Sequence, residues 1–294
     1  MSPETGPGTG MGAEYSNPDV PHEVNVSEKS PVRDFLRLSI GLGAIVVVVS
    51  AAAFFTARLW APLVPFRYEA ALADAVVKKI DGEPPSACEM DARRALQTLA
   101  DALAANMALP EGMTIRVHIN SDEIPNAFAT LGGNIVINRG LLENVHSENA
   151  LAMVMAHEIG HIKHRDPIVS LGGGVVVAVL FSSAIGGSDG GTLAGWAIGL
   201  TQMSFSRSQE EEADREALAA MRAYYGHTGG ADEFFAYIVE KYPELARMPA
   251  FASTHPAPPA RLQTIRASFP PVPRPLKPMP QAIQCMFQPE SPRP

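Results

Sequence analysis

The sequence contains little cysteine and has no excess of positive charge. Cys88 and Cys285 are its only cysteines, and their spacing matches neither a zinc ribbon nor a C-x-x-C redox pair. In an oxidising compartment the two could form one disulfide, whereas in the cytosol they would remain thiols, and the sequence leaves both possibilities open. The formal net charge of -8 gives no electrostatic reason to expect nucleic acid as a partner.

Hydrophobic residues make up 46% of the 294 residues, which is ample for the core of one large domain or two small ones. Residues 1–33 contribute little to this core, because they are rich in Gly, Pro, Ser and Glu and show little apolar periodicity. We therefore expect them to form a disordered N-terminal tail.

Residues 36–60 form an almost uninterrupted apolar stretch. A helix that crosses a bilayer needs about 20 apolar residues, so this stretch is long enough. It starts late and lacks a persuasive small-x-small cleavage site, which favours a transmembrane anchor in contact with lipid over a cleaved signal peptide. Basic residues flank both ends, so the positive-inside rule does not decide the orientation.

The rest of the chain is predicted to fold as helices around a small sheet. Two hydrophobic runs within residues 168–200, separated by a glycine-rich loop, predict either a helical hairpin at the protein surface or membrane interface, or core helices over the functional site. The proline-rich residues 271–294 are expected to form an extended C-terminal tail. The predicted helices cover residues 88–109, 206–225, 232–242 and 261–267, and the predicted strands cover residues 114–119, 126–130 and 134–138.

The strongest chemical signal is the motif H-E-x-x-H at residues 157–161. In a helix, positions i and i+4 lie on one face, so His157 and His161 can bind one zinc ion while Glu158 reaches its bound water. Ser147 is a plausible N-cap and Pro167 a plausible stop, so we expect the whole motif to lie in one helix.

A catalytic zinc ion takes three protein ligands and leaves one position for water, so a third ligand is needed. His164 lies on the same helix face, but seven residues of helix place it about 10 Å from His157, too far to share an ion. On a helical wheel of residues 206–225, Glu210 and Asp214 fall on the apolar side, whereas the other acids face away. A buried carboxylate is costly without a compensating partner. We therefore predict Glu210 as the third ligand and Asp214 as its supporting partner.

Further motifs surround these residues. The motif His157-Glu158-x-x-His161 is followed by His164-Arg165-Asp166-Pro167 and later by Ser206-Arg207-x-x-Glu210-x-x-Ala213-Asp214. Upstream of it lie Asn126-Ala127-Phe128, Gly133 and Gly140-Leu141-Leu142. Downstream lie Thr254-His255-Pro256 and Arg261. Together they resemble the M48 family of zinc metallopeptidases over about residues 65–270. The resemblance implies an α+β, mainly helical fold: a zincin-like (gluzincin) metalloprotease domain with a small β-sheet, preceded by one transmembrane helix.

The resemblance also implies a role for individual residues. His157, His161 and Glu210 would bind one Zn²⁺ ion, and Glu158 would be the catalytic base. His255 lies where relatives place a histidine near the metal, either in the open position of a resting form or steadying the reaction intermediate; the plain alternative is a loop histidine that caps a turn. The segment that resembles the substrate-binding edge strand contains Asn126, Ala127, Phe128 and Ala129.

The implied function is that of a membrane-anchored zinc metalloendopeptidase that cleaves unfolded or damaged membrane and envelope proteins. A single strong anchor and a weak later hydrophobic pair differ from the multi-spanning prenyl-protein peptidases. They favour a single-pass protein of the bacterial inner membrane whose peptidase domain faces the periplasm. The alternative is a non-catalytic chaperone or scaffold that binds unfolded chains and contains a structural zinc ion.

Overall fold

The structure is a computed structural model that describes residues 31–60, 63, 65–70, 73, 85–170, 205–241, 255, 258–269 and 274–287. The prediction of a hydrophobic hairpin at residues 168–200 lies outside this range except for its first three residues, as does the predicted disordered tail except for residues 31–33.

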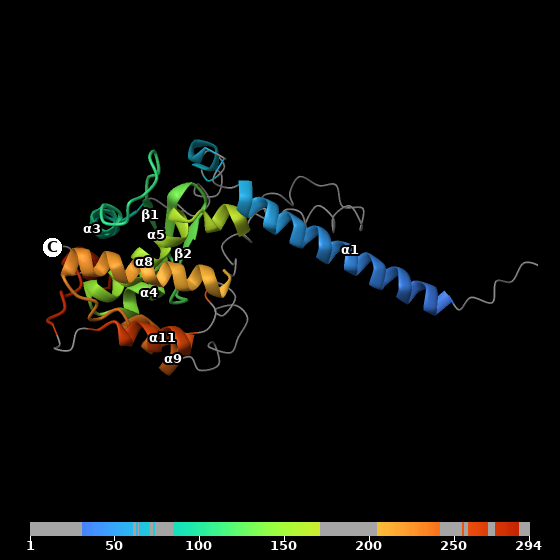
Figure 1. Cartoon of the computed structure of the whole chain (residues 1–294). Helices are drawn as coiled ribbons and strands as arrows, with labels where there is room; N and C mark the ends of the chain where they lie inside the picture. The colour runs from blue at the N-terminus through green and yellow to red at the C-terminus, as the bar shows by residue number, and fades with distance from the viewer. Residues whose placement is uncertain are drawn as a thin grey trace, which may run out of the picture. The chain divides into compact units, whose positions relative to one another are not determined.

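Helix α1, Pro31–Trp60, includes the predicted anchor and is drawn in blue in Figure 1. It begins within the predicted tail, because proline is favourable in the first turn of a helix and Asp34 complements the positive helix N-terminus. Its segment Pro31–Ala52 is the one candidate membrane span among the described residues, by length and composition. Its leucine, isoleucine and valine side chains are largely exposed.

Three short strands form the sheet, in the order β1 (Arg116–Asn120), β3 (Asn134–Asn138) and β2 (Ala127–Thr130). Strand β3 pairs in parallel with β1 and antiparallel with β2, so β2 lies at an edge, as predicted. Asn138 N–H donates to the Asn126 carbonyl (2.9 Å). Backbone groups alternate along a strand, so those of Ala127 and Ala129 point away from β3, to the side of β2 on which no strand lies among the described residues; we call this side the free edge of β2.

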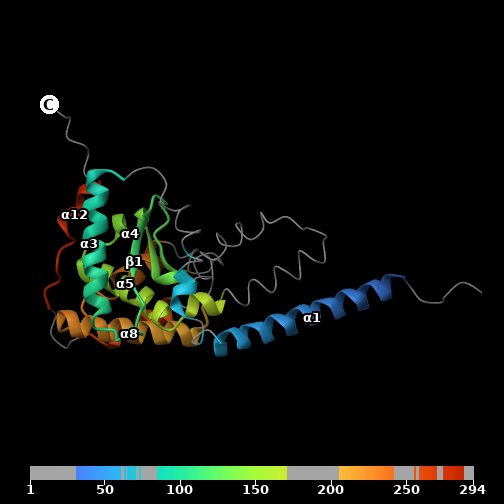
Figure 2. The same ribbon diagram turned by 90° about the horizontal axis from the view of Figure 1, so that it is seen from above.

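Helix α5, Glu148–Lys163, lies at the centre of the domain, and every residue from Asn149 to Ile162 is buried. Its neighbours in space include α3 (Ala87–Ala104), α8 (Arg207–Tyr225), α9 (Glu233–Lys241) and β2. Figures 1 and 2 both show α8 running close to α5. A Cβ atom at Gly160 would lie 3.1 Å from Ala213 Cα, so the missing side chain lets α8 approach α5 closely.

The predicted helix boundaries are largely confirmed. Ser147 caps α5 by accepting the Ala150 N–H bond, and the side chain of Gln209 accepts the Ser206 N–H bond at the start of α8. Gly226 ends α8 with a left-handed φ of 74°. Helix α3 ends five residues before the predicted Leu109, where the Asn106 side chain donates to the Ala102 carbonyl of the last turn. The short helix α4, Arg139–Asn144, was not predicted, and α11 spans Pro258–Ala267.

The C-terminal segment corrects the prediction of an extended tail. Residues 274–287 pack on the domain: the Lys277 backbone pairs with Glu148 and Asn149, and helix α12 (Gln281–Gln284) and the turn η5 (Cys285–Phe287) follow. Met279, which precedes α12, and Ile283 within α12 are both buried in the hydrophobic core. Cys285 forms a disulfide with Cys88 in the first turn of α3.

Candidate metal centre

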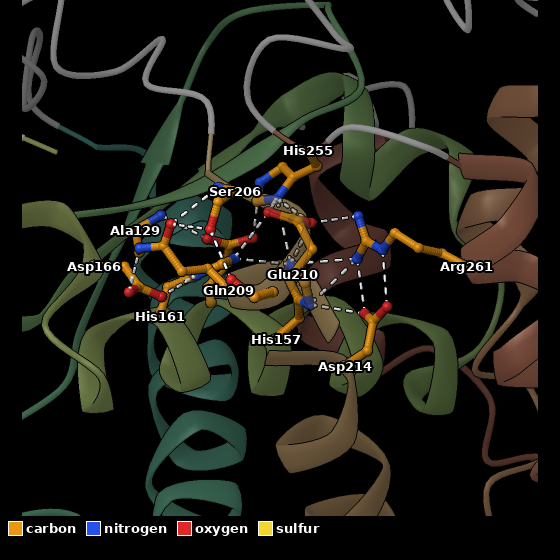
Figure 3. Close-up of polar contacts among 12 residues, drawn as sticks. Ala129, His157, His161, Asp166, Ser206, Gln209, Glu210, Asp214, His255 and Arg261 are labelled. Carbon is orange, nitrogen blue, oxygen red and sulfur yellow. Dashed lines mark hydrogen bonds and ion pairs between the residues drawn. The ribbon is translucent and has the colours of Figure 1, made fainter. Parts of the chain in front are cut away.

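Four side chains from three parts of the chain meet beside the C-terminal half of α5. His157 and His161 lie one turn apart on α5, Glu210 comes from the first turn of α8, and His255 precedes α11 (Figure 3). One nitrogen or oxygen atom of each lies within 4.8 Å of those of the other three. All four side chains are buried, and Glu210 is only 1% exposed. The structure thus brings together the three predicted ligands and His255.

The distances among these atoms fit a tetrahedral zinc site. His157 Nε2 lies 3.1 Å from His161 Nε2 and 3.5 Å from Glu210 Oε2, and His161 Nε2 lies 3.4 Å from Glu210 Oε1. A tetrahedron with metal–ligand bonds of ~2.0–2.1 Å has edges of about 3.3–3.4 Å. Two imidazole nitrogens and one carboxylate are also ligands that zinc commonly takes. The residues present therefore fit the ion that the sequence predicts.

Two carboxylates orient the histidines for this role. Asp166 Oδ2 lies 2.8 Å from His161 Nδ1, and Asp214 Oδ1 lies 3.0 Å from His157 Nδ1. A carboxylate that accepts the Nδ1–H bond leaves the Nε2 lone pair of the same ring pointing at the cluster. Asp214 thus supports His157 directly, whereas we predicted that it supports Glu210.

Arg261 connects Asp214 with Glu210. Its guanidinium donates two hydrogen bonds to the Asp214 carboxylate, at 2.7 and 2.8 Å, and lies 2.6 Å from Glu210 Oε2. It also stacks over the Phe235 ring, at 4.8 Å from the centroid. The buried arginine holds Glu210 and Asp214, the two buried acids of α8, in place, a role that its position in the sequence does not reveal.

The sequence does not predict that Asp166 orients His161 or that Gln209 holds Asp166. Gln209 Nε2 donates to Asp166 Oδ1 (2.5 Å), so the residue before Glu210 fixes the carboxylate that orients His161. Asp166 follows the end of α5, and the chain turns there through a left-handed Arg165 (φ 62°). The signal was present in the motif His164-Arg165-Asp166-Pro167, but helical periodicity cannot place a residue beyond such a turn.

The electrostatics of the cluster favour positive charge at its centre. Burial lowers the pKa of His161, but hydrogen bonds with Asp166 and Glu210 outweigh it and raise this pKa to about 9. Burial raises the pKa of Glu210, but the charge of His255 and hydrogen bonds from the three histidines hold it far below its ordinary value. A cation bound among these atoms would experience the same attraction.

Glu158 lies beside the cluster and beside the sheet edge. Its side chain is buried, and Oε2 accepts the Ala129 N–H bond at 2.7 Å. This N–H group is one of those that point to the free edge of β2. Asn126 and Ala127, at the other end of the predicted substrate strand, line a pocket together with Glu158, while Phe128 is buried and does not line it.

His255 stands close to the fourth corner of the site. Its Nδ1 lies 3.3 Å from His157 Nε2 and 3.0 Å from Glu210 Oε1. These distances resemble those among the three predicted ligands. The geometry therefore matches a histidine that occupies the open position.

His164 lies outside the cluster, as the sequence predicts. Its ring is 3.5 Å from Glu212 and 3.7 Å from Glu216, two acids on the outer side of α8. These three side chains form a second group, but each is only partly buried. Charged residues on an outer helix face are ordinarily solvated, so this group does not indicate a metal site.

Comparisons with known proteins show which family the chain resembles. The family model for Peptidase family M48 matches residues 91–268. The chain is 33% identical over 162 residues to the beta-barrel assembly-enhancing protease of Escherichia coli (strain K12), covering 50% of this chain and 33% of that protein. It is 33% identical over 231 residues to a protein named Protease HtpX homolog from Methylibium petroleiphilum, covering 63% of this chain and 79% of that protein.

A third relative is the beta-barrel assembly-enhancing protease of Yersinia pestis, which is 27% identical over 212 residues, covering 67% of this chain and 43% of that protein. The chain thus spans about a third to two fifths of the length of the beta-barrel assembly-enhancing proteases that it matches. The matched region includes both histidines, Glu158, Glu210 and His255.

Proposed function

Since the chain belongs to peptidase family M48, we propose that it is a zinc-dependent metalloendopeptidase with a zincin-like (gluzincin) active site. The observation that carries this proposal is the convergence of His157, His161 and Glu210 at tetrahedral distances, with the buried Glu158 beside them. His157, His161 and Glu210 would hold the ion, and Asp166, Asp214 and Arg261 would hold these ligands.

Glu158 is the catalytic base in this proposal. A bound zinc ion would supply Lewis acidity and would lower the pKa of a bound water molecule to about 7. The Glu158 carboxylate takes the proton of the attacking water and then returns it to the departing amine. His255 would also be able to hold the ion in a resting form, and it would have to move aside when a substrate binds, because the attacking water and the scissile carbonyl need room beside the ion.

The substrate binds as an extra strand at the free edge of β2. The backbone of Ala127 and Ala129 points to this edge, and Glu158 must release the Ala129 N–H group when a substrate takes it. Such pairing reads the backbone of an extended chain, and only unfolded segments can offer one. We therefore propose unfolded or misfolded polypeptides, including membrane and envelope proteins, as substrates.

The proposed location is a bacterial inner membrane, with α1 in contact with lipid as a single-pass anchor and the peptidase domain in the periplasm. The disulfide between Cys88 and Cys285 supports this side of the membrane, because disulfides persist in oxidising compartments.

The test compares zinc content and casein cleavage by the full chain in detergent. Glu158→Gln is expected to keep zinc and lose cleavage at least 100-fold. Glu210→Ala is expected to lose zinc itself, whereas Glu211→Ala, an exposed neighbour, keeps both properties. If the zinc-loaded wild type cleaves nothing and only binds unfolded casein, the protein is the chaperone or scaffold that the sequence leaves as the alternative. Equal zinc content in all variants would contradict the ligand assignment.

A further inference from the structure

The chain between α1 and the peptidase domain has large apolar side chains on its surface. Leu59 and Trp60, the last residues of α1, are 74% and 61% exposed, and Leu63 and Tyr68 beyond it are 69% and 55% exposed. We call residues 59–70 the connecting segment. Single exposed apolar residues are ordinary on a protein surface, but a concentration of them marks an interaction surface. Nothing in the roles proposed above uses these side chains.

The other side of the connecting segment is docked on the domain. Residues 66–70 are helical, and the buried Glu69 accepts the Gly132 N–H bond at 3.2 Å and pairs with Arg165 at 2.7 Å. The neighbouring Tyr68 stays exposed, because consecutive helix positions differ in direction by about 100°. The segment therefore has one side against the domain and one side turned outwards.

The charge of this region differs from that of the rest of the chain. No acidic residue lies between Asp34 and Glu69, although the chain has 31 acidic and only 23 basic residues. Glu69 itself is buried against the domain. Arg67 is exposed, and its guanidinium lies 5.0 Å from the centre of the Tyr68 ring. An apolar, aromatic and basic surface without acids suits the interface of a membrane with anionic head groups, where such side chains gather.

We propose that the exposed side of the connecting segment lies in the membrane–water interface and holds the free edge of β2 at the membrane surface. The occupant is lipid, because α1 runs without interruption from the candidate span Pro31–Ala52 into the connecting segment, with the exposed Phe55 between them. This inference rests on the proposed function. It narrows the substrates to unfolded segments that lie against the membrane or emerge from it.

The contacts of Glu69 set the distance between the free edge and the membrane. Its partner Gly132 belongs to the turn η3 (Leu131–Gly133) and lies two residues after the end of β2. A Cβ atom at Gly132 would lie 2.6 Å from Ala70 Cα, so the turn and the segment are in direct contact. A helix with its side chains is about 10–12 Å wide, so with Tyr68 in the interface the end of β2 lies about that far from lipid.

Fluorescence quenching tests whether the segment lies in lipid. The full chain, with Trp60→Phe and Trp196→Phe to remove its two tryptophans, is reconstituted in vesicles of phosphatidylcholine and phosphatidylglycerol. Tyr68→Trp then introduces a single probe. Lipids brominated in the upper part of the acyl chain should quench about half of its emission or more, because an indole at the interface contacts these atoms.

Tyr224→Trp in the same background is the matched control, because it makes the same chemical change at a position that is 38% exposed. Tyr224 lies twelve residues along α8 from Glu212, whose side chain is close to His164 and therefore to the region that Glu69 contacts. Twelve helical residues span about 18 Å. Brominated lipid should quench this probe at least fivefold less than the probe at Tyr68.

Cleavage tests the position of the free edge. One unfolded peptide is attached to a lipid in the same vesicles, either through two residues or through a Gly/Ser linker of about 30 residues, which reaches about 30 Å. The zinc-loaded wild type should cleave both forms at similar rates. Leu63→Glu with Tyr68→Glu places two charges on the outward side, and charged side chains leave the interface. This variant should cleave the short form at least fivefold more slowly and keep its zinc content and its cleavage of the long form.

Met90→Glu with Tyr224→Glu is the control for the added charge, because it introduces the same two charges at exposed apolar positions of α3 and α8. It should cleave both forms as the wild type does. If Leu63→Glu with Tyr68→Glu folds poorly, quenching still decides the matter, because Tyr68→Trp keeps an aromatic side chain at that position.

The outcomes separate this proposal from the proposed function. Equal quenching of the two probes would overturn the lipid contact. Emission at Tyr68→Trp that shifts to shorter wavelength without quenching would show that protein, such as a second copy of this chain, covers the surface, and would also overturn it. A wild type that cleaves casein and the long form but not the short form would overturn the position of the free edge and leave the peptidase intact. A zinc-loaded wild type that cleaves nothing would overturn the peptidase, whereas the quenching experiment, which needs no turnover, would still decide the lipid contact.

Discussion

At the scale of single residues, Asp166 has the most specific task outside the predicted ligands. It is buried and uses both carboxylate oxygens, one with His161 Nδ1 and one with Gln209 Nε2. Both partners donate, so the residue between them must accept twice. An asparagine has the same shape but offers one acceptor and one donor group.

We therefore expect Asp166→Asn to weaken zinc binding about 10–100-fold, which is typical when the partner of a metal-binding histidine is lost. Zinc affinity is measured by competition with a chelator. Asp91→Asn is the control, because it makes the same chemical change at an exposed position of α3. If both variants bound zinc as tightly as the wild type, Asp166 would have no part in orienting His161.

The sequence predicts the burial of a side chain correctly where that burial follows from the periodicity of a single helix. The wheel places Glu210 and Asp214 inside and Glu211 outside, and their burial confirms this. Arg261 and Asp166 belong to no such pattern. Arg261 reaches Asp214 from 47 residues away, and Asp166 reaches His161 through a turn in the left-handed region. Their contacts exist only once the helices have packed.

At the scale of elements, residues 66–70 form a helical segment that packs on the turn η3 (Leu131–Gly133) between β2 and β3. The buried Glu69 accepts the Gly132 N–H bond at 3.2 Å and pairs with Arg165 at 2.7 Å. A Cβ atom at Gly132 would lie 2.6 Å from Ala70 Cα. The segment thus joins the end of the proposed substrate strand to the turn that follows α5.

Gly132→Ala should therefore destabilise the domain more than Gly226→Ala. Both glycines have left-handed φ angles, 71° and 74°, which cost an alanine about 1–2 kcal/mol. Gly226 has open space around it, whereas at Gly132 the overlap with Ala70 adds about 1–3 kcal/mol. Urea denaturation of both variants measures the difference, and casein cleavage should fall further in Gly132→Ala because β2 moves. Equal stability of the two variants would refute the tight docking.

The helices and strands themselves could largely be read from the sequence, because caps and alternation are local signals. Ser147 and Gly226 mark helix ends through their own backbone and side-chain chemistry. The exceptions are short elements held by distant partners. Helix α12 has only four residues and depends on packing against α3, and the prolines in the residues around it suggested an extended tail instead.

At the scale of the whole molecule, the Cys88–Cys285 disulfide encloses almost the entire peptidase domain. The two cysteines are 197 residues apart in sequence, and the loop between them contains every residue of the candidate metal centre. A cross-link over so long a loop restricts the unfolded chain strongly and typically stabilises a fold by about 2–5 kcal/mol. It joins α3 to the C-terminal segment and does not touch the metal centre, so it should support stability rather than catalysis.

We therefore expect the Cys88→Ser, Cys285→Ser double variant to unfold at a clearly lower temperature, with zinc content and casein cleavage unchanged well below that temperature.

The redox state of the same two cysteines tests the proposed location of the domain. In intact cells a membrane-impermeant thiol reagent should label the wild type only after a reductant is added, if the domain lies in the periplasm. Labelling that requires cell lysis but no reductant would place reduced cysteines in the cytosol and contradict the proposed location. The double variant, which has no cysteine, measures the background of the labelling.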